Sequence, residues 1–173
     1  ASGPNLVLNG EFADTANGVP RYWFFNRSSG AATWGVGNGG LSIEPAVFVD
    51  VTQRGTNHWD IQLGQRGLAI ASDSTYRVQF QGKASRSRAM DVVVQKDRTP
   101  WTVYYYTTVS LTTTGQTFAL PFYVTSTDSV QLTFNCGGDT GRVWLDDVRF
   151  QRSPFARILD PGESLATRSV KLL

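Results

Sequence analysis

Apolar and polar residues alternate with a period of two along several segments of this chain. The alternation is strongest in four segments, residues 75–83, 90–95, 130–135 and 143–150. In the first of them Tyr76, Val78 and Phe80 are separated by polar side chains. A period of two is typical of a strand with one face in a core and the other face in solvent. These segments therefore predict half-buried β-strands.

Shorter segments with the same character fill much of the remaining chain. They cover residues 5–8, 21–26, 31–36, 41–49, 59–65, 101–110 and 116–124, and turn-rich pieces of Gly, Ser, Asn and Asp separate them. No stretch of 12 residues carries an apolar stripe with the helical period of 3.6. Many short strands with frequent turns predict an all-β protein, a two-sheet antiparallel β-sandwich.

The alternation stops at Gln151, and the dipeptide Ser153-Pro154 then breaks the backbone pattern. We therefore predict one domain over residues 1–151 and a linker or tail over 152–173. A linker toward a further domain and a disordered tail are both compatible with this composition. A chain of 173 residues is long enough to bury a core without covalent staples.

The single cysteine, Cys136, excludes an internal disulfide. It shares the parity of Leu132 and Phe134, which predicts a small buried hydrophobic residue rather than a reactive thiol. No cysteine pair or Cys/His cluster has the spacing of a zinc site. We therefore expect no transition-metal centre.

Charge argues against a nucleic-acid or membrane partner. The formal net charge is +2, and charged residues make up 17% of the chain. The nearest approach to a basic cluster, Lys83, Arg86 and Arg88, is expected to be a solvated loop. No apolar run approaches the roughly 20 residues of a membrane span. The chain begins at Ala1 without a signal peptide, as a processed protein would, and its Gly- and Thr-rich composition favours a secreted protein.

Four segments in order resemble carbohydrate-binding modules of the family 4, 9, 16 and 22 group, most closely the cleft-type modules of family 4. They are Asn5–Phe12, Trp59–Leu63, Tyr76–Ala84 and Val143–Val148, and the resemblance covers about residues 5–151. It implies a jelly-roll, galactose-binding-like sandwich without catalytic activity. It also implies that the module belongs to a secreted glycoside hydrolase and holds one polysaccharide chain on a concave face.

Uncharged amides occupy the polar side of the predicted strands. They are Gln79, Gln81, Gln95, Gln131 and Asn135. An amide offers both donors and an acceptor, which suits neutral sugar hydroxyls, and a rigid strand holds it with little entropy left to lose. The alternative is that these side chains only face water. The rarity of carboxylates among them favours a sugar-binding cleft.

Aromatic residues supply candidate platforms for pyranose rings. The resemblance implies that Trp59 stacks on a sugar, whereas its shared parity with Ile61 and Leu63 favours a core position. Both interpretations stay open at this stage. The second platform implied by the resemblance falls at Trp101, and Gln62 falls where the family hydrogen-bonds a sugar hydroxyl.

After Trp101, Tyr104 and Tyr106 share one face of the predicted strand and complete the proposed ligand set. At least one tyrosine of this run is expected in the core, because tyrosine is common in strands. Lys96 and Arg98 could reach the rim of the cleft, although simple solvent exposure would also explain them.

The resemblance further implies a structural Ca²⁺ between the N-terminal segment and the last strand. Asp146 matches one ligand, and Glu11 or its carbonyl matches another. Ala13 stands where the family often has Glu, so Asp14 would have to substitute. Residues 36–40 contain no acidic ligand, although Ca²⁺ takes six to eight oxygens.

The sequence lacks the catalytic motifs that an enzymatic function would require. A glycosidase needs two carboxylates across the scissile bond, but no catalytic motif surrounds Asp60, Asp91 or Glu44. A β-sandwich polysaccharide lyase would need Tyr, His and Arg together, and Ser-His-Asp catalysis would need a nucleophile elbow. Both would have to use His58, the only histidine.

We therefore predict a non-catalytic monomer that binds a single β-glucan chain, β-1,4 or mixed β-1,3/1,4, and targets an attached hydrolase to polysaccharide. The alternatives are the lyase and a cell-surface adhesion module without glycan specificity. The sequence does not decide among cellulose, mixed-linkage glucan, xyloglucan, xylan and β-1,3-glucan.

Overall fold

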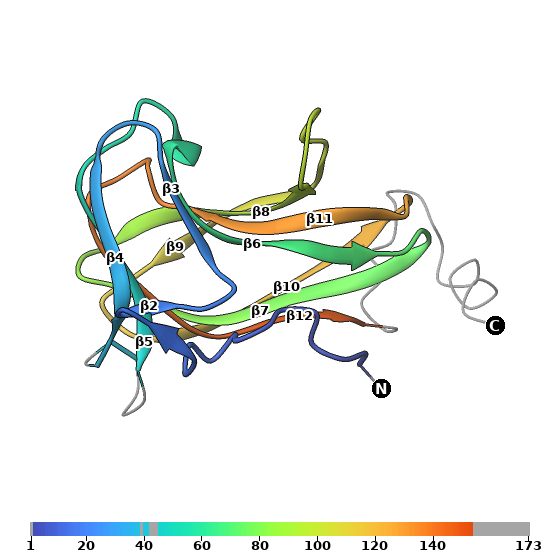
Figure 1. Cartoon of the computed structure of the whole chain (residues 1–173), viewed down its shortest axis with the longest axis horizontal. Helices are drawn as coiled ribbons and strands as arrows, with labels where there is room; N and C mark the ends of the chain where they lie inside the picture. The colour runs from blue at the N-terminus through green and yellow to red at the C-terminus, as the bar shows by residue number, and fades with distance from the viewer. Residues whose placement is uncertain (1, 39, 42–44, 154–173) are drawn as a thin grey trace.

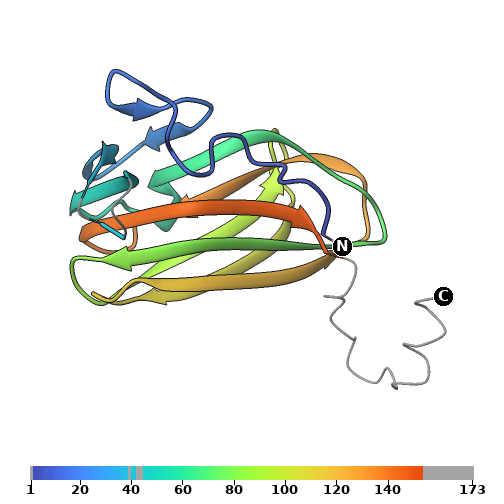
Figure 2. The same cartoon turned by 90° about the horizontal axis from the view of Figure 1, so that it is seen from below.

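Two antiparallel sheets of five strands each pack face to face in the computed structural model, which describes residues 2–38, 40–41 and 45–153. Figure 1 shows the two layers from the side, and Figure 2 shows the lower layer from below. Within these ranges no α-helix occurs. The predicted all-β, antiparallel two-sheet sandwich is confirmed.

We call the upper layer of Figure 1 the front sheet and the lower layer the back sheet. The front sheet has the order β3 (Phe24–Arg27), β6 (Ile61–Ile70), β11 (Asp128–Asn135), β8 (Arg88–Lys96) and β9 (Val103–Leu111). The back sheet has the order β10 (Gln116–Val124), β7 (Ser74–Ala84), β12 (Gly141–Arg152), β5 (Ala46–Gln53) and β4 (Ala31–Gly37). A small hairpin pairs β1 (Thr15–Ala16) with β2 (Val19–Pro20).

The core lies between the two sheets and consists of the apolar members of the alternating segments. Phe80 of the back sheet meets the ring of Phe134 edge-on, with centroids 5.1 Å apart, and stacks on Phe118 at the same distance. Cys136 is fully buried, as its parity predicts, and burial raises the pKa of its thiol to about 11. The thiol is therefore protonated at neutral pH and unreactive.

The N-terminal segment runs beside β12, although it forms no regular strand. The backbone N–H of Leu6 donates to the carbonyl of Phe150 at 2.8 Å, and that of Val148 donates to Gly10 at 2.9 Å. The Asn5 side chain accepts from the Phe150 N–H and donates to the Val148 carbonyl. A Cβ on Gly10 would lie 2.1 Å from the Val148 carbonyl oxygen, so this close approach requires glycine. The strand predicted over residues 5–8 is thus replaced by these specific contacts.

Among the other predicted boundaries that differ from the structure, two affect the exposed tryptophans. Residues 58–60 form a short 3-10 helix, so Trp59 precedes β6 instead of lying in it. β9 begins at Val103, so Trp101 belongs to the loop before that strand. Glu44 and residues 154–173 lie outside the described residues, and the predicted division into a domain and a linker or tail stays a prediction. No helix in the part of the chain that the structure describes is long and apolar enough to cross a membrane.

Truncation of the core aromatic Phe80 should destabilise the protein strongly. Phe80→Ala is expected to lower the free energy of unfolding by about 3–5 kcal/mol, because it removes a buried ring and leaves a cavity. Tyr106→Ala, which truncates an aromatic side chain that is 55% exposed, should cost less than about 1 kcal/mol. Urea denaturation of both variants measures the difference, and equal losses would contradict this assignment of the core.

Candidate functional site

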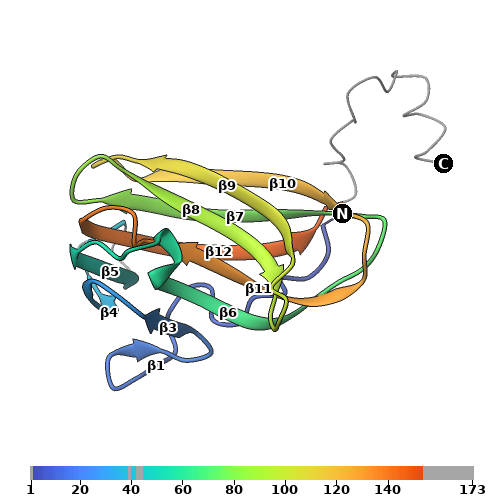
Figure 3. The ribbon, with the colours of Figure 1, turned by 90° about the horizontal axis from the view of Figure 1, so that it is seen from above.

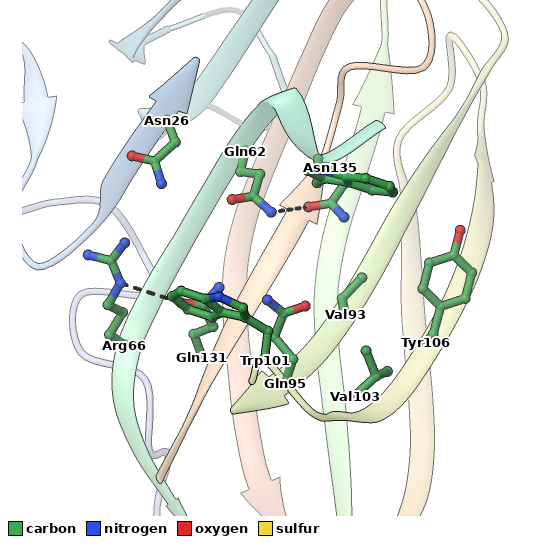
Figure 4. A pocket seen from close by; sticks show the side chains of 11 residues that line it. Asn26, Gln62, Arg66, Val93, Gln95, Trp101, Val103, Tyr106, Gln131 and Asn135 are labelled. Carbon is green, nitrogen blue, oxygen red and sulfur yellow. Dashed lines mark hydrogen bonds between the residues drawn. The ribbon is translucent and has the colours of Figure 1, made fainter. Parts of the chain in front are cut away.

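An open cavity of about 480 Å³ lies on the outer face of the front sheet, the face seen in Figure 3. We call it the Trp59–Trp101 cavity. It is lined by Asn26, Trp59, Gln62, Arg66, Val93, Gln95, Trp101, Val103, Tyr106, Gln131 and Asn135 (Figure 4). Among the described residues, the lining combines three exposed aromatic rings with five amides, and Arg66 is its one ionisable side chain apart from the Tyr106 phenol.

The alternation of the front-sheet strands builds the floor of the cavity. In β11 the side chain of Phe134 enters the core, so that of the adjacent Asn135 points outward. The Gln62 amide donates to the Asn135 carbonyl oxygen at 3.0 Å, and Figure 4 shows the two side chains pointing toward one another. The side-chain oxygen of Gln131 accepts a longer hydrogen bond, 3.4 Å, from Nε of Arg66. Each amide has two donors and one acceptor, so these contacts leave capacity for a ligand.

Trp59 stands on the 3-10 helix at one end of the cavity, and its surface is 59% exposed. Asp60 anchors this helix, since its carboxylate accepts from the Ser28 and Ser29 hydroxyls at 2.7 and 2.8 Å. These hydrogen bonds, that of Ser28 foremost, lower the pKa of Asp60. The parity argument that placed Trp59 in the core was wrong, because the residue lies in a helical turn where the two-residue period does not hold.

His58, the residue before Trp59, connects the 3-10 helix to β8 through a side-chain hydrogen bond with Asp91. Its Nδ1 lies 2.7 Å from Oδ2 of Asp91, and the other oxygen of Asp91 accepts from the Thr108 hydroxyl at 2.8 Å. Asp60 and Asp91 are both buried. The acid–base candidates considered from the sequence thus take part in hydrogen bonds that attach the Trp59 helix to its surroundings.

Trp101 stands on the loop between β8 and β9, and its surface is 44% exposed. This loop and the Trp59 helix both rise from the outer side of the front sheet (Figure 1). Asp128 lies beneath the loop and accepts hydrogen bonds from Tyr104 and Arg98. The bond from Tyr104 is the main reason that the pKa of Asp128 falls to about 2. Lys96 and Arg98, the candidate rim residues, both contact Asp128, and neither lines the cavity.

A β-bulge separates the three consecutive tyrosines. Gln95 pairs with Val103 and Val94 pairs with Tyr105, which leaves Tyr104 as the extra residue. Tyr106 therefore lines the cavity with Val103, while Tyr105 packs on the core ring of Phe122 at 4.6 Å. The prediction that Tyr104 and Tyr106 share a face is wrong, because an inserted residue shifts the parity.

Gln79 and Gln81, two of the predicted ligand residues, lie on β7 in the back sheet. They flank the core residue Phe80 and face away from it, on the opposite side of the sandwich from the cavity. Their place in the predicted cleft is thus wrong. Periodicity identifies the polar face of a strand, but it does not say to which of the two sheets that strand belongs.

Four residues of the cavity were missed in the sequence: Asn26, Arg66, Val93 and Val103. Arg66 shares the parity of Gln62, four residues earlier in β6, and its guanidinium lies 4.2 Å from the centroid of the Phe24 ring. Val93 shares the parity of Gln95 in the same way. The signal for both was present in the alternation, whereas Asn26 reaches the cavity only through the pairing of β3 with β6.

The predicted calcium ligands lie around the N-terminal segment. Among the described residues no three His, Cys, Asp or Glu side chains gather into a cluster that could hold a metal. Asp14 forms an ion pair with Arg21 at 3.0 Å, and an oxygen of Asp146 accepts from the Asp147 N–H at 2.8 Å. Glu11 and Asp14 border a separate groove of about 420 Å³ with Asp147. A Ca²⁺ ion here would need backbone oxygens as well, so this site stays a prediction.

Comparison with known proteins connects this chain to carbohydrate binding. The family model described as a carbohydrate binding domain, CBM_4_9, matches residues 4–142. A search of the curated proteins finds no match. Among solved structures, a CBM4 domain is 28% identical with a TM-score of 0.68, and the alignment covers 84% of this chain and 99% of that one.

Two further solved domains share the fold at lower identity. The N-terminal cellulose-binding domain of β-1,4-glucanase C from Cellulomonas fimi is 21% identical with a TM-score of 0.59, over 78% of this chain and 90% of that one. The CBM22-1 xylan-binding domain from Paenibacillus barcinonensis is 12% identical with a TM-score of 0.63, over 91% and 98%.

A bound Ca²⁺ ion would tie the N-terminal segment to β12, so we predict that Ca²⁺ stabilises the chelator-treated protein. At a concentration of 100 times Kd the gain would be about 2.7 kcal/mol. Thermal unfolding with and without Ca²⁺ measures it. Asp146→Asn should remove the gain, whereas Asp73→Asn, a change beside β7, should retain it. An unchanged melting temperature at saturating Ca²⁺ would contradict the site.

Proposed function

We propose that this chain, which belongs to the carbohydrate binding domain family CBM_4_9, binds a single neutral β-glucan chain in the Trp59–Trp101 cavity without catalysing its cleavage. The family match confirms the resemblance predicted from the sequence, and membership supports polysaccharide binding. The observation that carries the finer proposal is the pair of exposed tryptophans standing over a cavity floored with amides.

The chemistry of the cavity suits a neutral sugar. An indole face attracts the polarised C–H groups of a pyranose ring, and two separate indoles allow contacts with different rings of one chain. The floor amides Gln62, Gln95, Gln131 and Asn135 can donate to and accept from hydroxyl groups. No carboxylate occurs in the described lining, so the floor holds no paired acid and base.

We assign the ligand to β-1,4-glucan or mixed β-1,3/1,4-glucan. The Cellulomonas fimi relative binds cellulose, a β-1,4-glucan, and the Paenibacillus barcinonensis relative binds xylan. An open cavity accommodates an extended chain better than an isolated monosaccharide, because a chain can contact both tryptophans. In this proposal the module is secreted, works as a monomer, and directs an attached glycoside hydrolase to its polysaccharide.

The positions of the acid–base groups support binding without catalysis. Hydrolysis of a glycosidic bond needs two carboxylates on opposite sides of that bond. Asp60 and Asp91 neighbour cavity residues, Asp60 in the chain and Asp91 by its pairing with Asn135, but neither lines the cavity, and each accepts hydrogen bonds from neighbouring hydroxyl groups. A polysaccharide lyase would require His58 as the base, and His58 does not line the cavity.

Affinity electrophoresis against a panel of soluble polysaccharides tests the proposed ligand. Migration should slow in gels that contain mixed-linkage or β-1,4-linked glucan, slow less in xylan, and stay unchanged in pectin or alginate. The same mixtures should release no reducing sugar and develop no absorbance from unsaturated uronate. Unretarded migration in every neutral β-glucan would overturn the proposal, as would turnover that is lost in His58→Ala.

Removal of either tryptophan platform should weaken glucan binding without unfolding the protein. Trp101→Ala and Trp59→Ala are each expected to reduce affinity about 30-fold, since aromatic anchors in interfaces contribute about 2 kcal/mol or more. Both rings are substantially exposed, so the melting temperatures should stay near that of the wild type. Tyr22→Ala removes a ring that is 61% exposed and lies outside the cavity, and it serves as the control. Wild-type affinity in a folded tryptophan variant would exclude that residue from the site.

A further inference from the structure

The loop that carries Trp101 is attached on both sides to one carboxylate, that of Asp128. Arg98, three residues before the tryptophan, donates from Nη2 to Oδ1 at 3.1 Å. Tyr104, three residues after it, donates its hydroxyl hydrogen to Oδ2 at 2.5 Å. Asp128 is the first residue of β11, a central strand of the front sheet. The two sides of the loop therefore meet on a rigid element.

A second carboxylate attaches the start of the same loop. Asp97 accepts from the Ser129 hydroxyl at 2.6 Å and from the Gly67 backbone N–H at 3.3 Å. Its other oxygen accepts from Arg98 at 3.0 Å. The loop is thus bound to β11 and to β6, and Arg98 bridges the two carboxylates.

The backbone at Trp101 needs such restraint. Its φ angle is +61°, in the left-handed region that residues with a Cβ atom rarely adopt, and its N–H donates to the Arg98 carbonyl at 2.8 Å. A conformation of this kind persists when the surrounding contacts hold it in place. A stacking platform also binds best when its orientation is set before the ligand arrives, because less conformational entropy is then lost.

We propose that Asp128 and its partner Tyr104 are positioning residues that hold Trp101 in its sugar-stacking orientation. Neither side chain lines the cavity, so their effect on a sugar passes through the loop. Tyr104, which was predicted from the sequence to contact the ligand, thereby has a different role. The proposal rests on the proposed function, and the experiments below separate the two.

Tyr104→Phe tests the proposal with minimal disturbance, because it removes one hydroxyl and keeps the ring. Affinity for mixed-linkage glucan should fall about 3- to 10-fold, the effect of one hydrogen bond, with little change in the melting temperature. Asp128→Asn should lower affinity at least as much. Tyr123→Phe is the matched control, because it removes another tyrosine–aspartate bond, 2.6 Å long, on the back sheet, and it should bind as the wild type does.

A double variant distinguishes positioning from a general structural effect. In a Trp101→Ala background, Tyr104→Phe should leave the residual affinity unchanged, because the platform that it positions is gone. Independent losses that add in the double variant would overturn the proposal. So would wild-type affinity in both Tyr104→Phe and Asp128→Asn when Trp101→Ala itself binds weakly, and that result would leave the proposed function intact.

Hydrogen exchange supplies a measurement that needs no ligand. The backbone amide of Trp101 should exchange faster with solvent in Tyr104→Phe than in the wild type, and at the wild-type rate in Tyr123→Phe. Equal exchange in all three proteins would overturn the positioning role even if no glucan binds. Failure of the wild type to bind any glucan would instead remove the proposed function and leave this measurement to decide the role of Tyr104.

Discussion

The burial of apolar side chains between the two sheets is the constraint on which the cavity floor depends. Because Leu63, Val94 and Phe134 must lie in the core, the neighbouring Gln62, Gln95 and Asn135 must point outward. A slip of one residue in any of these strands would exchange the two sets and place amides in the core. The interaction that stabilises the fold therefore also selects which groups line the cavity.

The core does not extend to the segments that carry the two tryptophans, a short 3-10 helix for Trp59 and a loop for Trp101. Polar contacts replace apolar packing there. The Asp60 carboxylate accepts hydrogen bonds from the hydroxyls of Ser28 and Ser29 beside Trp59. The Asp128 carboxylate accepts hydrogen bonds from Arg98 and Tyr104 beside Trp101. Both carboxylates have a lowered pKa because the hydrogen bonds favour the charged form. The module thus combines a floor held by hydrophobic packing with platforms held by charge-assisted hydrogen bonds.

Local pattern was sufficient for the fold class and for three of the four floor amides, Gln95, Gln131 and Asn135, because the period of two is a direct consequence of a strand with one buried face. The pattern failed where the position of a residue depends on how the strands are arranged in the folded structure. Gln79 and Gln95 each follow a valine on the polar side of a predicted strand, yet they lie on different sheets. Tyr104 and Tyr106 were assigned the same face, because nothing in the sequence marks the bulge between them. Trp59 was ambiguous, since a single turn of 3-10 helix before a strand leaves no periodic signal.

The complete burial of Cys136 has a practical consequence for the chemical labelling of this protein. It is the only cysteine in the chain, it lies entirely within the core, and burial keeps its thiol protonated at neutral pH. A cysteine introduced on the surface would therefore be the only thiol accessible to a maleimide or a spin label. Labels at chosen points along the rim could then report the distance between the two platforms, and the native thiol would not need to be replaced.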